Sequence, residues 1–125
     1  MTCRNLALTA LMVVLPFGTG LAAAASHFAS APSRDHLRQN PFDRQAGAAA
    51  AGALLYRNHC AQCHRADAAG DRKHPSLRSP QVRAATDGDL EWFLRQGDLR
   101  HGMPSWSSLP QAQRWQIIAY LRSLK

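Results

Sequence analysis

The five residues Cys60-Ala61-Gln62-Cys63-His64 constrain this chain more than any other part of its 125 residues. The pattern C-x-x-C-H is typical of covalent attachment of a c-type haem. Two thiols three positions apart can each add to one vinyl group of the same porphyrin, and the residue that follows them then lies over the iron. We therefore predict one haem c per chain, attached through Cys60 and Cys63, with His64 as an axial ligand of the iron.

Three other interpretations of the two cysteines compete with haem attachment. A thioredoxin-like dithiol needs a βαβ context, and no alternating strand pattern occurs in this sequence. A zinc site could use Cys60, Cys63 and two of His64, His74 and His101, but no second ligand pair lies at the spacing of a zinc knuckle. A disulfide across two intervening residues would close a very small loop and contribute little stability. Haem attachment remains the favoured interpretation.

The first 25 residues have the organisation of a secretory signal peptide. Arg4 supplies the positive start, an apolar stretch follows from Leu6 to Leu15, and Ala23-Ala24-Ala25 offers a cleavage site before Ser26. We predict cleavage near Ala25-Ser26, a periplasmic location and no membrane span after cleavage. The alternative is that the same stretch remains as a membrane tether.

The composition limits the partners of the chain. Its 15 Lys and Arg residues against 8 Asp and Glu give a formal charge of +7, and the size allows one small domain. Export and the lack of an aromatic-basic recognition pattern argue against nucleic acid. We expect a monomer that meets redox proteins through their acidic patches. The basic residues cluster in sequence around the cysteine motif: Arg57, Arg65, Arg72, Lys73, Arg78 and Arg83.

The chain after the signal divides into a lead segment and a helical domain. Residues 26–46 contain two prolines and no helical period, which predicts a flexible lead segment, either free or draped on the domain. Residues 47–125 carry helical patterns only, so we predict an all-α domain. The expected helices are roughly 46–58, a short one at 81–85 after the cap Ser79 and Pro80, one from the cap Thr86 to Gly97, and a last one starting at Ser108 with Gln111 completing a capping box.

Met103 is the favoured second ligand of the iron. The other two methionines lie in the predicted signal, and Gly102-Met103-Pro104 describes a tight loop between two helices. A thioether favours ferrous iron and gives a higher potential than a second histidine. His101 and then His74 are the alternatives for this position.

Together these residues resemble the small class I cytochromes c of bacterial export compartments, over roughly residues 47–125. Gly52 and Tyr56 precede the cysteine motif as in the first helix of that family. Ile117, Tyr120 and Leu121 are similar to the last helix. The resemblance implies a small cytochrome c fold, with three to four helices around a covalent haem and the first and last helices crossing. Gly52 has no Cβ, so the last helix can approach it closely.

Two further segments resemble loops of that family. Pro75-Ser76-Leu77 is similar to a turn whose proline carbonyl accepts a hydrogen bond from the proximal histidine, which implies this role for Pro75 and a porphyrin contact for Leu77. His74 stands where the family usually has glycine. Met103-Pro104-Ser105-Trp106 is similar to the distal-ligand loop, which places Trp106 near the haem.

The wider layout resembles the short monohaem domains found alone or attached to terminal oxidases and quinoprotein dehydrogenases. It implies a periplasmic one-electron carrier with His64/Met103 ligation, and not an enzyme. The expected partners are a terminal oxidase, a dehydrogenase or another cytochrome. The alternative function is a haem sensor or haem enzyme component with a labile sixth ligand.

Overall fold

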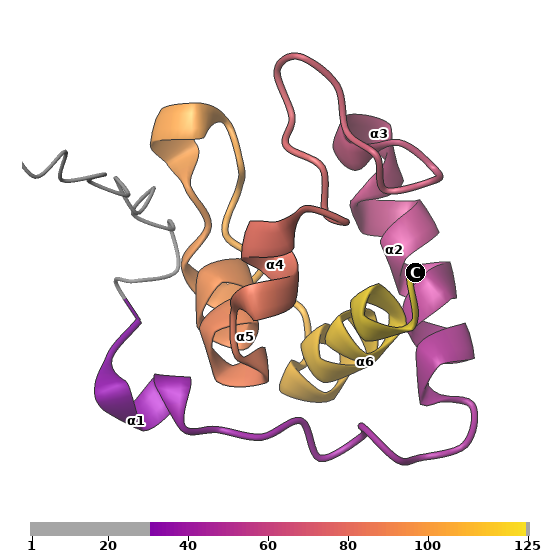
Figure 1. Ribbon diagram of the computed structural model, residues 1–125, viewed down its shortest axis with the longest axis vertical. Coiled ribbons are helices and arrows are strands. Elements are labelled where there is room, and N and C mark those ends of the chain that lie inside the picture. The colour runs from indigo at the N-terminus through magenta and orange to yellow at the C-terminus, as the bar shows by residue number, and fades with distance from the viewer. Residues whose placement is uncertain (1–30, 125) are drawn as a thin grey trace, which may run out of the picture.

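The computed structural model describes residues 31–124, so the predicted signal peptide, its cleavage site and residues 26–30 lie outside the described part. Within it the elements are helices (Figure 1). The described residues form one isolated bridge, between Asp98 and Met103, and no longer strand. None of their helices is long and apolar enough to cross a membrane. The helices are α1 (Ser33–His36), α2 (Ala48–His59), α3 (Ala61–His64), α4 (Pro80–Ala84), α5 (Asp87–Gln96), the 3₁₀ helix η2 (Leu99–His101) and α6 (Gln111–Ser123).

The crossing of α2 and α6 organises the domain. Figure 1 shows α6 between α2 on one side and α4 and α5 on the other. A Cβ added to Gly52 of α2 would lie 1.9 Å from the backbone carbonyl oxygen of Gln116, so the backbones of the two helices come this close only because this residue is glycine. Tyr56 is fully buried, and its ring lies 5.1 Å from that of Tyr120. The predicted all-α fold with crossing first and last helices is therefore confirmed.

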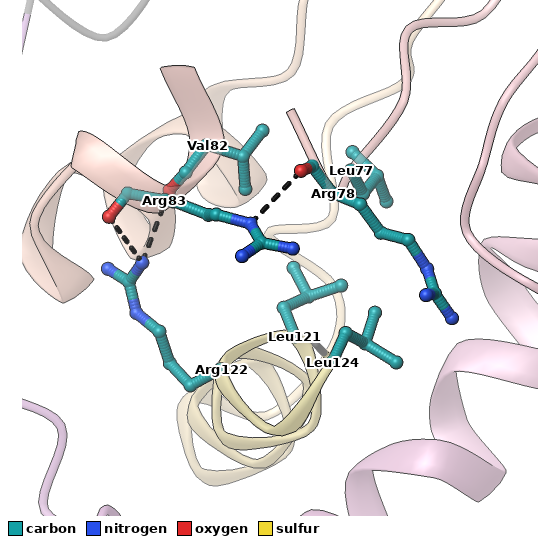
Figure 2. Close-up of a pocket in the computed structure, with 7 residues that line it drawn as sticks. All are labelled: Leu77, Arg78, Val82, Arg83, Leu121, Arg122 and Leu124. Atoms are coloured by element: carbon teal, nitrogen blue, oxygen red, sulfur yellow. Dashed lines mark hydrogen bonds between the residues drawn. The ribbon is translucent and has the colours of Figure 1, made fainter. Parts of the chain in front are cut away.

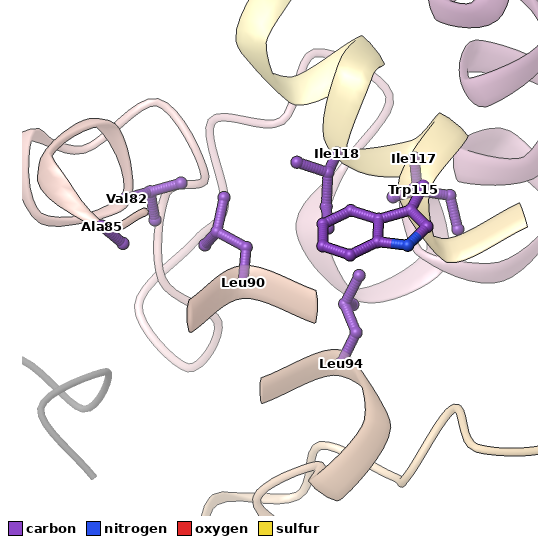
Figure 3. Close-up of a cluster of buried hydrophobic side chains, with 7 residues drawn as sticks. All are labelled: Val82, Ala85, Leu90, Leu94, Trp115, Ile117 and Ile118. Atoms are coloured by element: carbon purple, nitrogen blue, oxygen red, sulfur yellow. The ribbon is translucent and has the colours of Figure 1, made fainter. Parts of the chain in front are cut away.

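The hydrophobic core lies on the other face of α6. Figure 3 shows the buried side chains of α4, α5 and α6 converging on one cluster. This cluster orients the two short helices against the long one and leaves their loops on the outside. Its members are Val82, Ala85, Leu90, Leu94, Trp115, Ile117 and Ile118.

The starts of α4 and α5 follow the predicted caps. The Ser79 hydroxyl accepts a hydrogen bond from the Val82 amide at 3.3 Å, and Pro80 occupies the first helical position. Thr86 and Asp89 form a reciprocal capping box, with amide-to-side-chain distances of 3.1 and 2.9 Å. Gly97 ends α5 with a φ of 69°.

The predicted start of the last helix was wrong. Helix α6 begins at Gln111, with Pro110 as its N-cap and no side-chain cap, so Ser108 and Gln111 form no capping box. The residue before a proline is biased away from helical backbone angles. Leu109 therefore cannot belong to a helix that continues through Pro110, and its carbonyl accepts a hydrogen bond from the Arg114 guanidinium instead.

The described part of the lead segment packs on the helical domain. Residues 31–46 contain α1 and run along the edge of the domain to α2 (Figure 1). Asp35 and Asn40 are only 4% and 6% exposed, and the Asn40 side-chain amide donates to the Trp115 carbonyl at 2.9 Å. Residues 31–46 therefore lie on the domain, where their polar side chains find partners on α5 and α6 that no local pattern reveals.

Candidate haem site

The two cysteines stand at the junction of α2 and α3. The Cys60 amide donates to the Tyr56 carbonyl at 2.8 Å, and the His64 amide donates to the Cys60 carbonyl at 2.9 Å, so one continuous backbone carries the whole motif. Both thiols are free; Cys63 is exposed and Cys60 is partly buried. Burial raises the pKa of the Cys60 thiol to about 11, which keeps it protonated at neutral pH. Two adjacent thiols are thus available for thioether formation.

His64 is fixed by one ring nitrogen. It is 8% exposed, and its Nδ1 lies 3.0 Å from the Pro75 carbonyl oxygen. A carbonyl only accepts, so Nδ1 carries the proton and Nε2 is left with a lone pair. Burial lowers the pKa of His64, although the Pro75 hydrogen bond acts in the opposite direction. A buried neutral imidazole with a carbonyl behind it has the arrangement of a metal-ligating histidine.

The turn that supplies Pro75 accommodates His74 without difficulty. Its Nδ1 lies 3.0 Å from a carboxylate oxygen of Asp71, and the same oxygen accepts from the Lys73 and His74 amides at 2.8 Å. Gly70, with a φ of 67°, allows the chain to fold back, because a Cβ there would lie 2.3 Å from the His74 carbonyl oxygen. The departure from the family's usual glycine at this position therefore leaves the hydrogen bond between His64 and Pro75 intact.

Backbone hydrogen bonds to Asp98 hold Met103 in place. Its amide and carbonyl pair with those of Asp98 at 2.9 and 2.8 Å, and Gly102 before it has a φ of 84°. The Met103 side chain is partly buried and packs against the hydrophobic core. We call residues 97–110, between α5 and α6, the Met103 loop.

Trp106 connects the Met103 loop to the cysteine motif. Its amide donates to the Leu94 carbonyl at 2.9 Å, and its ring meets the ring of His59 edge to face, with centroids 5.4 Å apart. His59 directly precedes Cys60. The structure thus brings the end of α2 against the Met103 loop, although more than 40 residues separate them in sequence.

The two alternative histidine ligands are engaged with carboxylates. His101 is exposed, and its Nδ1 lies 2.7 Å from Asp98, while His74 pairs with Asp71. Across residues 31–124, no three side chains of His, Cys, Asp or Glu come together in a group that could hold a metal ion. The structure therefore assembles no third or fourth ligand for the zinc interpretation.

A cleft of about 220 Å³ opens beside Leu77. Figure 2 shows leucine and valine side chains on its walls and three guanidinium groups around its edge. Backbone carbonyls fix all three arginines: Arg78 donates to Asp67 at 2.7 Å, Arg83 donates to Arg78 at 3.1 Å, and Arg122 donates to Val82 at 3.2 Å. Arg78 and Arg83 belong to the basic residues that cluster in sequence around the cysteine motif and form part of a basic rim, whereas Arg122 joins them only through the fold.

The donor set and the cleft fit a c-type haem. Covalent attachment needs two neighbouring thiols, iron needs an imidazole with a free Nε2, and a porphyrin needs apolar walls with cations near its carboxylates. Cys60 and Cys63 supply the thiols and His64 supplies the imidazole, while the cleft, which shares Leu77 with the predicted site, offers apolar walls and guanidinium groups. An α-helical domain with this set of side chains defines a c-type cytochrome.

Comparison with known proteins agrees with this class. Residues 47–121 match the family model described as cytochrome c oxidase, cbb3-type, subunit III, and the chain belongs to this family of cytochrome c domains. A search of curated proteins gave no match.

One solved structure that resembles the chain is that of cytochrome cL from the marine methylotrophic bacterium Methylophaga aminisulfidivorans MPT. The two are 27% identical with a TM-score of 0.59, and the match covers 68% of this chain. The matched part spans 60% of the length of the cytochrome cL chain. The resemblance to small c-type cytochromes noted from the sequence is therefore confirmed.

Proposed function

We propose that this protein is a periplasmic one-electron carrier whose haem c is bound through Cys60 and Cys63, with His64 and Met103 as axial ligands. The observation that carries the proposal is the hydrogen bond of 3.0 Å between His64 Nδ1 and the Pro75 carbonyl, which leaves Nε2 for a metal. When bound, the haem supplies an Fe(III)/Fe(II) couple. With two protein ligands on the iron, no position remains for a substrate, so electron transfer is the function that fits.

Each part of the site has a separate task. The Pro75 carbonyl fixes the tautomer of His64 and strengthens it as a donor. The backbone pairing of Met103 with Asp98 presets the position of the thioether before it binds. Leu77 and Trp106 supply apolar surface against the porphyrin, and a low dielectric around the iron helps to set its potential.

The charge of the protein supports transient docking to redox proteins with acidic patches. Attraction between a basic rim and such a patch raises the association rate more than the affinity and weakens as salt is added. We propose a terminal oxidase, a dehydrogenase or another cytochrome as the partner of a monomeric carrier. The match to the cbb3-type subunit III family and the likeness to cytochrome cL support this choice.

Visible spectra of the protein, produced with haem-maturation machinery, test the proposal. The wild type should retain its haem after denaturation and acid-acetone extraction, and its oxidised form should show the weak far-red band of methionine ligation. Met103→Ala should lose that band and change its potential, because the thioether sulfur is gone. His101→Ala, two residues away and exposed, is the matched control and should keep both.

Other results would lead to a different function. If Met103→Ala kept the band and the potential of the wild type, the assignment of Met103 would be wrong. A high-spin haem, or rapid reaction of the native protein with carbon monoxide or peroxide, would indicate a sensor or enzyme component with a labile sixth ligand. Absence of covalent haem would indicate that Cys60 and Cys63 serve as a redox dithiol or as metal ligands instead.

A further inference from the structure

A fully buried carboxylate joins three separate parts of the chain. Glu91 of α5 has no exposed surface. One of its oxygens accepts hydrogen bonds from Nε and a terminal nitrogen of Arg114 on α6, at 3.0 and 2.8 Å. The other oxygen accepts from Arg38 of the lead segment at 3.1 Å. A charge buried this deeply is tolerated only with partners of this quality.

The same network reaches the Met103 loop. The Arg114 guanidinium that binds Glu91 also donates to the carbonyls of Trp106, at 3.4 Å, and of Leu109. One turn of α5 further on, the Arg95 carbonyl accepts from the Ser105 hydroxyl at 2.6 Å. The second half of the Met103 loop is therefore tied to α5 and α6 by hydrogen bonds on its carbonyl groups and on one side chain.

The lead segment contacts the network at several points. The Arg95 guanidinium donates to the buried Asp35 carboxylate at 3.0 Å, and the Thr86 hydroxyl donates to the His36 carbonyl at 2.8 Å. Helix α1 lies directly on the backbone of α5, because a Cβ on Gly88 would fall 1.8 Å from the Asp35 carbonyl oxygen. The close packing of the lead segment against α5 therefore depends on a glycine at position 88.

We propose that the lead segment, through Arg38, and the buried pair of Glu91 and Arg114 form a positioning device that keeps Met103 on the iron. This inference rests on the proposed function. Stability alone does not account for the network, since apolar side chains of similar volume often stabilise a protein as well as a buried ion pair. Apolar side chains could not donate hydrogen bonds to the carbonyls of Trp106 and Leu109, as Arg114 does. Removing a direct partner of a metal ligand typically changes metal binding by about 10–100-fold, and because Arg114 acts through the backbone of Trp106 and Leu109 we expect an effect at the low end of that range.

Competition by added imidazole tests the inference, because imidazole binds ferric haem only after Met103 has left. Arg38→Gln removes one partner of Glu91, and Gly88→Ala lifts the lead segment without changing any charge. Each should raise the affinity of the ferric protein for imidazole by about tenfold and weaken the far-red band. The matched control is Ala50→Gly at an exposed position of α2, which lowers stability through helix propensity and changes no side chain of the network or of the Met103 loop.

Denaturation of all three variants separates positioning from general stability. We expect Ala50→Gly to lose stability while its affinity for imidazole stays within about twofold of the wild type. If Arg38→Gln and Ala50→Gly changed the affinity equally for an equal loss of stability, the inference would be refuted while the proposed function stood. A wild type without the far-red band would overturn both.

Discussion

The approach of α6 to α2 makes the substitution Gly52→Ala a sharp test of the fold. The added Cβ would lie 1.9 Å from the Gln116 carbonyl oxygen, 2.6 Å from its carbon and 3.0 Å from Cβ of Tyr120. Ordinary contacts of a Cβ begin at 3.4 Å, so α6 must retreat locally by about 1.5 Å. Backbone atoms of a helix cannot rotate away as the end of a flexible side chain can.

Two opposing effects decide the size of the loss. Alanine is better than glycine inside a helix by about 1 kcal/mol, which favours the variant. Forcing an extra carbon into a packed contact typically costs about 1–3 kcal/mol, and this contact is among the most severe because its partner is backbone. Separation of the helices also loosens the buried contact between Tyr56 and Tyr120. We expect a net loss of about 2 kcal/mol, or about 10 °C in Tm for a domain of this size.

Reversible denaturation by urea, with far-UV circular dichroism as the readout, measures this loss. Ala50→Gly, at an exposed position of the same helix, is the matched control and should lose about 1 kcal/mol through helix propensity alone. Gly52→Ala should lose more than Ala50→Gly, even though its propensity change has the opposite sign. A Gly52→Ala variant as stable as the wild type would refute the close crossing of α2 and α6.

Two further predictions concern local structure. Thr86→Ala removes the cap of α5 and should lower the free energy of unfolding, measured in urea, by about 1 kcal/mol. Ser108→Ala is the control and should leave the free energy of unfolding unchanged, because Ser108 caps no helix. Equal losses in the two variants would contradict the observed start of α6. Hydrogen bonds from the Lys73 and His74 amides lower the pKa of Asp71 from 3.8 to about 2, so the charged carboxylate stabilises the fold above pH 4 and this contribution disappears as the pH falls toward 2. Thermal denaturation over this range should show the advantage of the wild type over Asp71→Asn shrinking with acid, and an advantage independent of pH would contradict the assignment.

The parts of the site that the sequence revealed depend on short-range patterns. The spacing of Cys60, Cys63 and His64 and the caps at Ser79 and Thr86 each involve residues within a few positions of one another. Their meaning follows from the geometry of one turn of helix. Gly52 was identified through resemblance to a family, since nothing beside it in the chain indicates which helix approaches it.

The arrangement of the lead segment could not be predicted in the same way. Residues 31–46 lack a helical period, and no local pattern in them indicates what they pack against. Their order comes instead from partners about 50 or more positions away, such as Glu91 for Arg38 and Trp115 for Asn40. The start of the last helix differs from its prediction for a related reason. The local pattern at Ser108 resembles a cap, but Pro110 biases Leu109 away from helical backbone angles.

One charged residue on α5 and one on α6 have roles in this domain that the sequence alone does not reveal. In the sequence, Glu91 and Arg114 are indistinguishable from charges on solvated helix faces, yet they are 0% and 5% exposed. The range that matches the family begins at residue 47, whereas one partner of Glu91 is Arg38. Arg114 lies within the matched range, so Glu91 draws one hydrogen-bonding partner from inside the family pattern and another, Arg38, from before it. Because a buried carboxylate is costly when it loses a partner, Arg38 helps to stabilise Glu91 although it lies outside the family pattern.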